Sequence, residues 1–239
     1  MGRAFAPDAI FRLGAVCQCK ITTSAGLRTK SMSERMIFPL FSTPVYINNV
    51  GDFESPNLRS LDYSSTMPTG GSYNFLSSVD KNVLDRPEFK GVHDIVMKEV
   101  NLYAREILSV SNSIEFYVTN SWVNVHGRGH SAGSHVHNNS LISGVLYLQV
   151  TETSGDLVFH RDILSLVPFP PSLDLDVDSF NIYNCKSWGY RPKKNDICLF
   201  PSVVMHSADP NESDEERWCL AFNVFVKGNI GALHKLSIK

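Results

Sequence analysis

SAGSHVHNNSLISGVLYLQV (residues 131–150) joins a polar, glycine-containing segment to a β-type apolar run. It places His135 and His137 two residues apart just before that run, in a chain that has eight histidines. Side chains two apart in a β-strand lie on the same face, so the spacing predicts two imidazoles that bind one object together. A metal ion is the first candidate, and further ligands must then come from elsewhere in the chain.

Short β-type runs continue on both sides of this stretch, separated by Gly, Pro, Asn and Asp. The runs are IEFYVTNSWVNVH (114–126), LISGVLYLQV (141–150), GDLVFH (155–160), SFNIYNC (179–185), NDICLFP (195–201) and RWCLAFNVFV (217–226). Many short strands without a long helix between them predict a β-sandwich or β-barrel. Residues 51–80, rich in Ser, Gly, Asn and Pro, are predicted to be loop.

One amphipathic helix is predicted ahead of these strands, in RPEFKGVHDIVMKEVNLYAREILSV (86–110). Its apolar face follows spacings of four, four, three and four residues, through Val92, Val96, Val100, Tyr103 and Ile107. Proline 87 stands near the expected start, where its missing N–H does no harm. The sequence therefore predicts a mainly β fold with a supporting α-helix.

Composition narrows the class of protein. The chain has 239 residues, of which 43% are hydrophobic and 19% charged, as in a globular protein with a sizeable core. A net charge of −2 offers no overall attraction to nucleic acid or to an anionic membrane, and no apolar run is long enough to span a bilayer. Five scattered cysteines without a C-x-x-C pair favour a reducing, cytoplasmic setting over a disulfide framework.

Residues 1–35 differ from the rest of the chain. They are rich in Lys, Arg, Ser and Thr, with only Asp8 and Glu34 as acidic residues. Such a composition is typical of an organellar transit peptide and equally of a disordered tail. The predicted organisation is a disordered or cleavable extension over residues 1–35, followed by a single domain over residues 36–239.

A third histidine, His206, follows the run NDICLFP after a Pro-Ser break, and Arg217 opens the last predicted strand. In a closed two-sheet barrel a distant strand can lie beside His135 and His137, so His206 is a candidate third ligand. Generic packing of histidines is the alternative interpretation. Two further histidines, His126 and His130, are interpreted as solvated loop residues, and His160 as a neighbour of the site.

Three segments carry a family resemblance: SWVNVHGRGHSAGSHVHNNSLISGVLYLQV (121–150), SGDLVFHRD (154–162) and KKNDICLFPSVVMHSADPNESDEERWCLAFNVFV (193–226). They resemble the core of the 2-oxoglutarate- and Fe(II)-dependent oxygenases, and within these the prolyl-hydroxylase-like branch with its bacterial and phage relatives. The resemblance implies a double-stranded β-helix, the cupin-like jelly roll. It implies His135 and His206 as metal ligands, Arg217 as the partner of the cosubstrate's far carboxylate, and Tyr147 near that carboxylate.

One position departs from the family motif, because His137 stands where a carboxylate is usual. A carboxylate cancels part of the charge of Fe(II), whereas a triad of His135, His137 and His206 leaves the metal with its full double charge. A dianionic cosubstrate compensates for that charge. Imidazole ligands also suit zinc, copper and nickel, so the identity of the metal stays open.

The resemblance implies a non-haem dioxygenase that uses Fe(II) and 2-oxoglutarate, with ascorbate as an optional cofactor. It would hydroxylate a small molecule or a peptide, with release of succinate and carbon dioxide; nucleic acid and membrane partners are not expected. Two alternatives stay open: a three-histidine metal dioxygenase that does not use 2-oxoglutarate, and a non-catalytic cupin-like binding module. Arg217 separates the first from the main interpretation, because an enzyme that binds its substrate directly has no need of it there.

Overall fold

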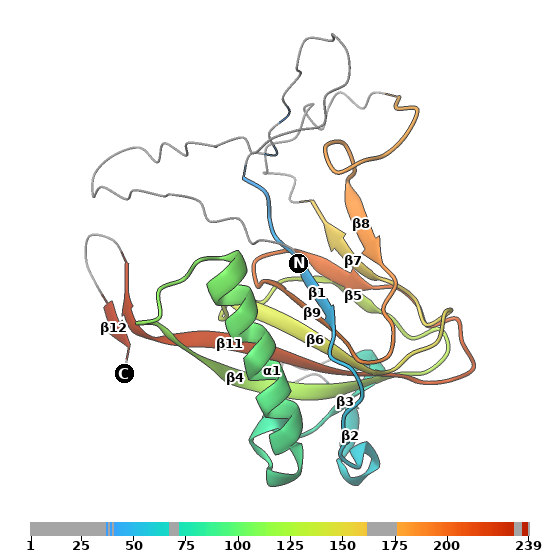
Figure 1. Ribbon diagram of the computed structural model, residues 1–239. Helices are drawn as coiled ribbons and strands as arrows, with labels where there is room; N and C mark the ends of the chain where they lie inside the picture. The colour runs from blue at the N-terminus through green and yellow to red at the C-terminus, as the bar shows by residue number, and fades with distance from the viewer. Residues whose placement is uncertain are drawn as a thin grey trace. The chain divides into compact units, whose positions relative to one another are not determined.

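Two antiparallel sheets carry the fold of the computed structural model (Figure 1). The larger has the strand order β1-β9-β6-β11-β4-β3-β2, with β12 paired to β11, and the smaller has the order β5-β10-β7-β8. The strands of the larger sheet are β1 (Tyr46–Asn49), β2 (Tyr63–Thr66), β3 (Ser72–Ser78), β4 (Glu115–His126), β6 (Ile142–Gln149), β9 (Asp196–Pro201), β11 (Arg217–Ile230) and β12 (Leu236–Ile238). Those of the smaller sheet are β5 (Ala132–His135), β7 (Leu157–His160), β8 (Ser187–Tyr190) and β10 (His206–Ala208).

The structure describes residues 37, 39, 41–66, 72–161, 176–231 and 236–238. The predicted extension over residues 1–35 lies outside them. Within the described residues, no helix has both the length and the apolar character needed to cross a membrane.

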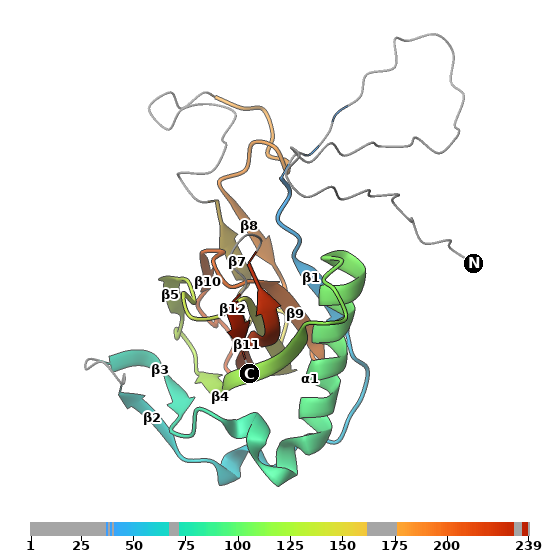
Figure 2. The same cartoon turned by 90° about the vertical axis from the view of Figure 1, so that its left-hand side faces the viewer.

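One long helix, α1 (Lys90–Leu102), lies along the face of the larger sheet that is turned away from the smaller sheet (Figures 1 and 2). Its buried residues Val92, Val96 and Val100 form the main core with β4, β6, β9 and β11. Short helical turns flank it: η1 (Leu58–Ser60), η2 (Val83–Asp85), η3 (Pro87–Phe89) and the π-helical turn η4 (Tyr103–Ile107).

Side chains on the two faces of the central strands enter two different interiors, the core under α1 and the cavity between the sheets. On β4, Val123 and Val125 pack in the core under α1, whereas Trp122, Asn124 and His126 line a cavity between the sheets. Strand β11 alternates in the same way: Leu220 and Val224 belong to the core, and Arg217, Cys219 and Ala221 line the cavity. The period-2 alternation thus places polar residues inside the barrel at intervals.

The predictions from sequence are largely confirmed for the long strands and for the helix, and are wrong at three places. The predicted strand 179–185 is not a strand; residues 181–184 form a turn, and β8 begins at Ser187. The predicted loop 51–80 contains the whole of β2 and β3. Ile107 is 52% exposed because the π-helical turn, with Leu108 N–H donating to Tyr103 O (3.1 Å), rotates it out of the buried face.

Candidate metal centre

The structure brings the three predicted ligands together at one place. His135 is the last residue of β5 and His206 the first of β10, and the two are direct partners across these antiparallel strands. His137 follows β5 by two residues. One ring nitrogen from each of the three lies within 4.8 Å of the others, so a single ion placed among them can contact all three imidazoles. We call these three residues the histidine triad.

The local reason for this convergence differs from the one predicted. His137 lies beyond the end of β5, so alternation within one strand does not place it beside His135. Instead its backbone N–H donates to the carbonyl of Ser202 (2.9 Å), just after β9, and its ring stacks against Trp122 with centroids 5.9 Å apart. The chain after β5 is therefore attached to the larger sheet, and this attachment directs His137 toward the other two histidines.

Hydrogen bonds fix the tautomers of two members of the triad. Nδ1 of His135 lies 2.7 Å from the carbonyl oxygen of Gly133, and Nδ1 of His206 lies 2.9 Å from that of Val204. A carbonyl only accepts, so in each neutral ring Nδ1 carries the proton and Nε2 carries the lone pair that a metal needs.

Burial favours the neutral form of His137 and His206. It lowers the pKa of His137 from 6.5 to about 4, with a further contribution from His135. Burial is also the main cause that lowers the pKa of His206 to about 4. Neutral imidazole is the form that binds metals, so these residues fit an Fe(II) ion, as they would other divalent ions that accept nitrogen ligands.

Arg217 and Tyr147, the two predicted cosubstrate residues, line the same cavity as the triad, which has a volume of about 590 Å³. Arg217 is 2% exposed, and its Nη1 donates to the carbonyl oxygens of Ser154 and Asp209. Gly155 makes this cradle possible: it adopts φ +83°, and a Cβ there would lie 2.5 Å from the Pro210 carbonyl oxygen. The guanidinium is therefore fixed from one side before any ligand arrives.

The other side of the guanidinium has no partner. Among the described residues, four buried side-chain atoms lack a hydrogen bond: Asn124 Oδ1, both ring nitrogens of His126, and Arg217 Nη2. All four belong to residues that line the cavity, and Arg217 is the direct cross-strand partner of His126. Leaving such groups unsatisfied costs about 1–3 kcal/mol each, so this part of the wall is suited to a polar ligand, and the free Nη2 to an anionic one.

His126 is the residue that sequence reasoning missed. It is the last residue of β4 rather than a solvated loop residue, is 2% exposed, and stacks on Phe75 with centroids 4.5 Å apart. Burial, and then the charge of Arg217, lower its pKa to about 3. The available signal was its position in the predicted strand 114–126, where it shares a face with Trp122 and Asn124.

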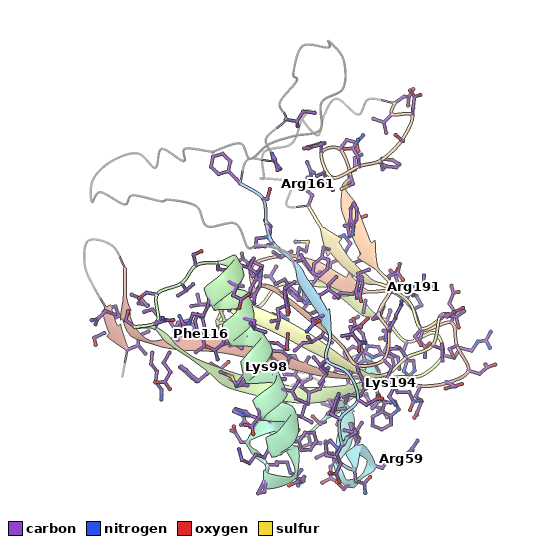
Figure 3. The ribbon with its side chains drawn as sticks, viewed as in Figure 1. Arg59, Lys98, Phe116, Arg161, Arg191 and Lys194 are labelled. Carbon is purple, nitrogen blue, oxygen red and sulfur yellow. The ribbon has the colours of Figure 1, made fainter. Side chains whose placement is uncertain are left out.

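The remaining candidates lie at the margin of the site. Nε2 of His160 is 2.8 Å from Ser207 Oγ, next to His206, as expected of a neighbour of the triad. Asp156 pairs with Arg191, which follows β8 (Figure 3), and is thus engaged away from the triad. The described residues that line the cavity include no Asp or Glu. The triad therefore has no carboxylate in that lining to add to its three imidazoles.

Comparison with known families agrees with this geometry. Residues 120–223, which contain the whole triad and Arg217, match the model of the family described as "Putative 2OG-Fe(II) oxygenase". This match places the similarity to 2OG-Fe(II) oxygenases on the segment that carries the candidate metal centre. None of the curated proteins matches this chain in sequence.

One solved structure supports the fold assignment. HygX from Streptomyces hygroscopicus, with nickel, 2-oxoglutarate and hygromycin B bound, is 14% identical to this chain, with a TM-score of 0.52. The alignment covers 76% of this chain and 82% of HygX. A prolyl hydroxylase from Trichoplax adhaerens, in complex with a hypoxia inducible factor peptide fragment, is 13% identical with a TM-score of 0.48, and the alignment covers 70% and 72% of the two chains. The predicted double-stranded β-helix is confirmed.

Proposed function

We propose that this protein is a 2OG-Fe(II) oxygenase that holds Fe(II) through His135, His137 and His206 and uses 2-oxoglutarate as cosubstrate to hydroxylate a substrate bound in the cavity. The observation that carries the proposal is one cavity that combines three convergent imidazoles with a buried, half-satisfied guanidinium. The imidazoles supply the metal ligands, and Arg217 supplies a fixed positive charge for the far end of a dicarboxylate.

Bound at the triad, Fe(II) and 2-oxoglutarate supply dioxygen activation and oxidation of a substrate C–H bond, with release of succinate and carbon dioxide. The protein's part is binding and orientation. His135, His137 and His206 would hold the metal through three ring nitrogens and would leave coordination positions for the cosubstrate and for dioxygen. Because no carboxylate lines the described cavity wall, the carboxylate at the keto-acid end of 2-oxoglutarate would supply the negative charge beside the metal, and metal binding would then be coupled to cosubstrate binding.

Arg217 would meet the far carboxylate through Nη2, since Nη1 is already bonded to two backbone carbonyls. Neutral His126, its cross-strand neighbour, would donate one N–H to the same carboxylate. Tyr147, which is 4% exposed and whose pKa burial raises well above its ordinary value, stays a neutral phenol in the cavity wall. Charge and hydrogen bonding at this end would thus select a dicarboxylate over a monocarboxylate.

The substrate is proposed to be a small molecule or a peptide that carries an anionic group. Lys81 supports this, because it lines the cavity, is half-buried, and donates to the neutral hydroxyl of Ser77 (2.8 Å). No Asp or Glu of the described residues pairs with it, so its charge is compensated by no side chain there. The free cysteines Cys185, Cys198 and Cys219 agree with a reducing compartment, and a cytoplasmic location is proposed on that ground.

The deciding experiment is turnover by the full chain loaded with Fe(II) in air. We expect 2-oxoglutarate labelled at its first carbon to release labelled carbon dioxide and an equal amount of succinate, with ascorbate sustaining the rate over repeated turnovers. Release should stop in His206→Ala and continue in His130→Ala, a half-buried histidine outside the cavity lining. If 2-oxoglutarate neither binds nor is consumed, the three-histidine dioxygenase or the binding module becomes the better account.

A further inference from the structure

The third histidine of the triad is supported differently from the other two. Nδ1 of His137 lies 3.1 Å from the side-chain amide of Asn223, on β11, instead of beside a backbone carbonyl. An asparagine amide can present either its oxygen or its nitrogen to a ring, so Asn223 has a choice that Gly133 and Val204 do not have. Which end faces His137 decides which nitrogen of that ring carries the proton.

Behind Asn223 runs a buried chain of three hydroxyls, Ser143, Ser202 and Ser140, which we call the serine chain. Ser143 Oγ lies 2.9 Å from Asn223 Oδ1 and 2.9 Å from Ser202 Oγ, which lies 2.9 Å from Ser140 Oγ. Asn223 and the three serines are each no more than 6% exposed. Ser202 also accepts the backbone N–H of His137, so the backbone and the ring of His137 are attached to the same cluster.

The number of available hydroxyl protons determines which serine of the chain donates to which. Ser140 Oγ has two carbonyl oxygens to donate to, those of Ile142 (3.0 Å) and Val224 (3.1 Å), and it accepts from Val224 N–H. Each serine has one proton, so with that of Ser140 committed, Ser202 must donate to Ser140 and Ser143 must donate to Ser202. Asn223 must then donate to Ser143 through Nδ2.

In the structure Nδ2 of Asn223 is the end that faces His137, and Oδ1 is the end that faces Ser143. Rotation of the amide by half a turn exchanges the positions of Oδ1 and Nδ2. It turns Oδ1, an acceptor, toward Nδ1 of His137. A ring that donates from Nδ1 has its lone pair on Nε2, the arrangement that His135 and His206 already have.

We propose that Asn223, aligned by the serine chain, is a positioning residue that accepts the Nδ1 proton of His137 and thereby reserves Nε2 of His137 for the metal. This inference rests on the proposed metal centre. Asn223 acts through His137, whose other flank is held by Trp122. Metal-bound histidines usually donate their second ring N–H to an acceptor. Asn223 would supply that acceptor to His137, the imidazole that stands where the family motif usually has a carboxylate.

The test is Zn(II) affinity, measured by competition with a chelator, for the full-length wild type and four variants. Asn223→Leu removes the acceptor, and we expect it to lose about 10- to 100-fold in affinity. Asn223→Asp keeps an acceptor at the same place and should rescue the affinity. Ser143→Ala, which only frees the amide to rotate, should show a smaller loss. The control is Asn120→Leu, the cross-strand partner of Asn223 on β4, which should bind as the wild type does.

Nitrogen-15 NMR of the Zn(II)-loaded protein provides a readout that a merely structural role would not move. We expect His137 to show a protonated Nδ1 in the wild type and in Asn223→Asp, and in Asn223→Leu, at saturating Zn(II), that proton should exchange faster with water. A proton on Nε2 of His137 in the loaded wild type, or wild-type affinity in Asn223→Leu, would overturn the inference while leaving the metal centre intact. A wild type that binds no Zn(II) would overturn the metal centre itself.

Discussion

Discrimination between 2-oxoglutarate and 2-oxopentanoate should depend on Arg217. The two ligands have the same chain length and the same keto-acid end, and differ by a carboxylate in place of a methyl group at the far end. In the wild type the far carboxylate would meet Nη2 of Arg217, a buried donor without a partner. In Arg217→Gln the charge is absent, while the shorter amide still has a donor for the carbonyl oxygens of Ser154 and Asp209.

The structure sets the expected size of the effect. Nη1 of Arg217 is committed to two backbone carbonyls, so the contact with the ligand is counted as one charge-assisted hydrogen bond from Nη2. Such a bond contributes about 1.5–3 kcal/mol, which corresponds to about a 10- to 150-fold preference for 2-oxoglutarate. In Arg217→Gln the preference should fall to within a few fold of unity, because only the neutral hydrogen bond from His126 would then distinguish the two ligands.

Calorimetric titration of both ligands into Mn(II)-loaded wild type and Arg217→Gln gives all four affinities under anaerobic conditions. Manganese affinity and melting temperature are measured alongside, so that a folding defect is separated from a ligand effect. The two proteins and two ligands form a thermodynamic cycle like a double-mutant cycle. It separates the contact between the guanidinium and the far carboxylate from changes that affect both ligands equally. A preference for 2-oxoglutarate that survives unchanged in Arg217→Gln would refute the assignment of Arg217.

Further predictions concern the metal, acid stability, packing and the N-terminal extension. His206→Ala should abolish stoichiometric Fe(II) binding, whereas His137→Asp should retain it, as judged by metal analysis after gel filtration. Because folded His126 has a pKa of about 3 against an ordinary value of 6.5, unfolding takes up a proton below pH 6.5. The free energy of unfolding should therefore decrease as the pH is lowered from 6.5 to 5, and His126 should contribute up to about 1.4 kcal/mol per pH unit to this decrease. Urea denaturation measures this dependence, and His126→Phe should reduce it. Gly144→Ala should destabilise by about 1–3 kcal/mol, since its Cβ would lie 2.2 Å from Phe222 Cζ, whereas Gly91→Ala meets nothing within 4 Å and should not lower the melting temperature. Removal of residues 1–35 should leave both metal affinity and melting temperature unchanged; a large drop in either would contradict the predicted domain boundary.

The strands predicted best from the sequence are those that bury side chains on both faces. In β4 and β11 one set of alternate residues packs under α1 and the other lines the cavity, so the runs are long and β-type throughout. Strands β2 and β3 were missed because they form one edge of the larger sheet and lie in a polar segment. Edge strands have little apolar surface to bury, and periodicity gives no signal there.

The false strand at 179–185 has a local cause. Phe180 and Ile182 are 74% and 56% exposed, so apolar residues there do not report burial. The side chain of Asn181 accepts from Tyr183 N–H (2.8 Å), and that of Asn184 accepts from Asn181 N–H (2.7 Å). Asparagine side chains that bond to nearby backbone favour a turn over a ladder, and here they prevail over β-propensity.

The site was predicted as a set of residues, without the arrangement that supports them. The spacing of His135 and His137 identified the pair, but the attachment of His137 to Ser202 and Trp122 depends on tertiary contacts that spacing does not contain. Asn223 lies in the run CLAFNVFV, where nothing local distinguishes a residue that holds a ligand from one that merely fills the sheet. Only the register of β11 beside β6 brings it to Ser143, its direct partner there.

The most direct test of a three-histidine iron and 2-oxoglutarate centre is an anaerobic absorption titration. A 2-oxo acid that chelates Fe(II) through its keto and carboxylate oxygens produces a visible metal-to-ligand charge-transfer band. We predict that Fe(II)-loaded wild type develops this band on addition of 2-oxoglutarate, that the band saturates at one equivalent per chain, and that His206→Ala never develops it. A wild type that binds Fe(II) tightly yet shows no band at saturating 2-oxoglutarate would contradict the account.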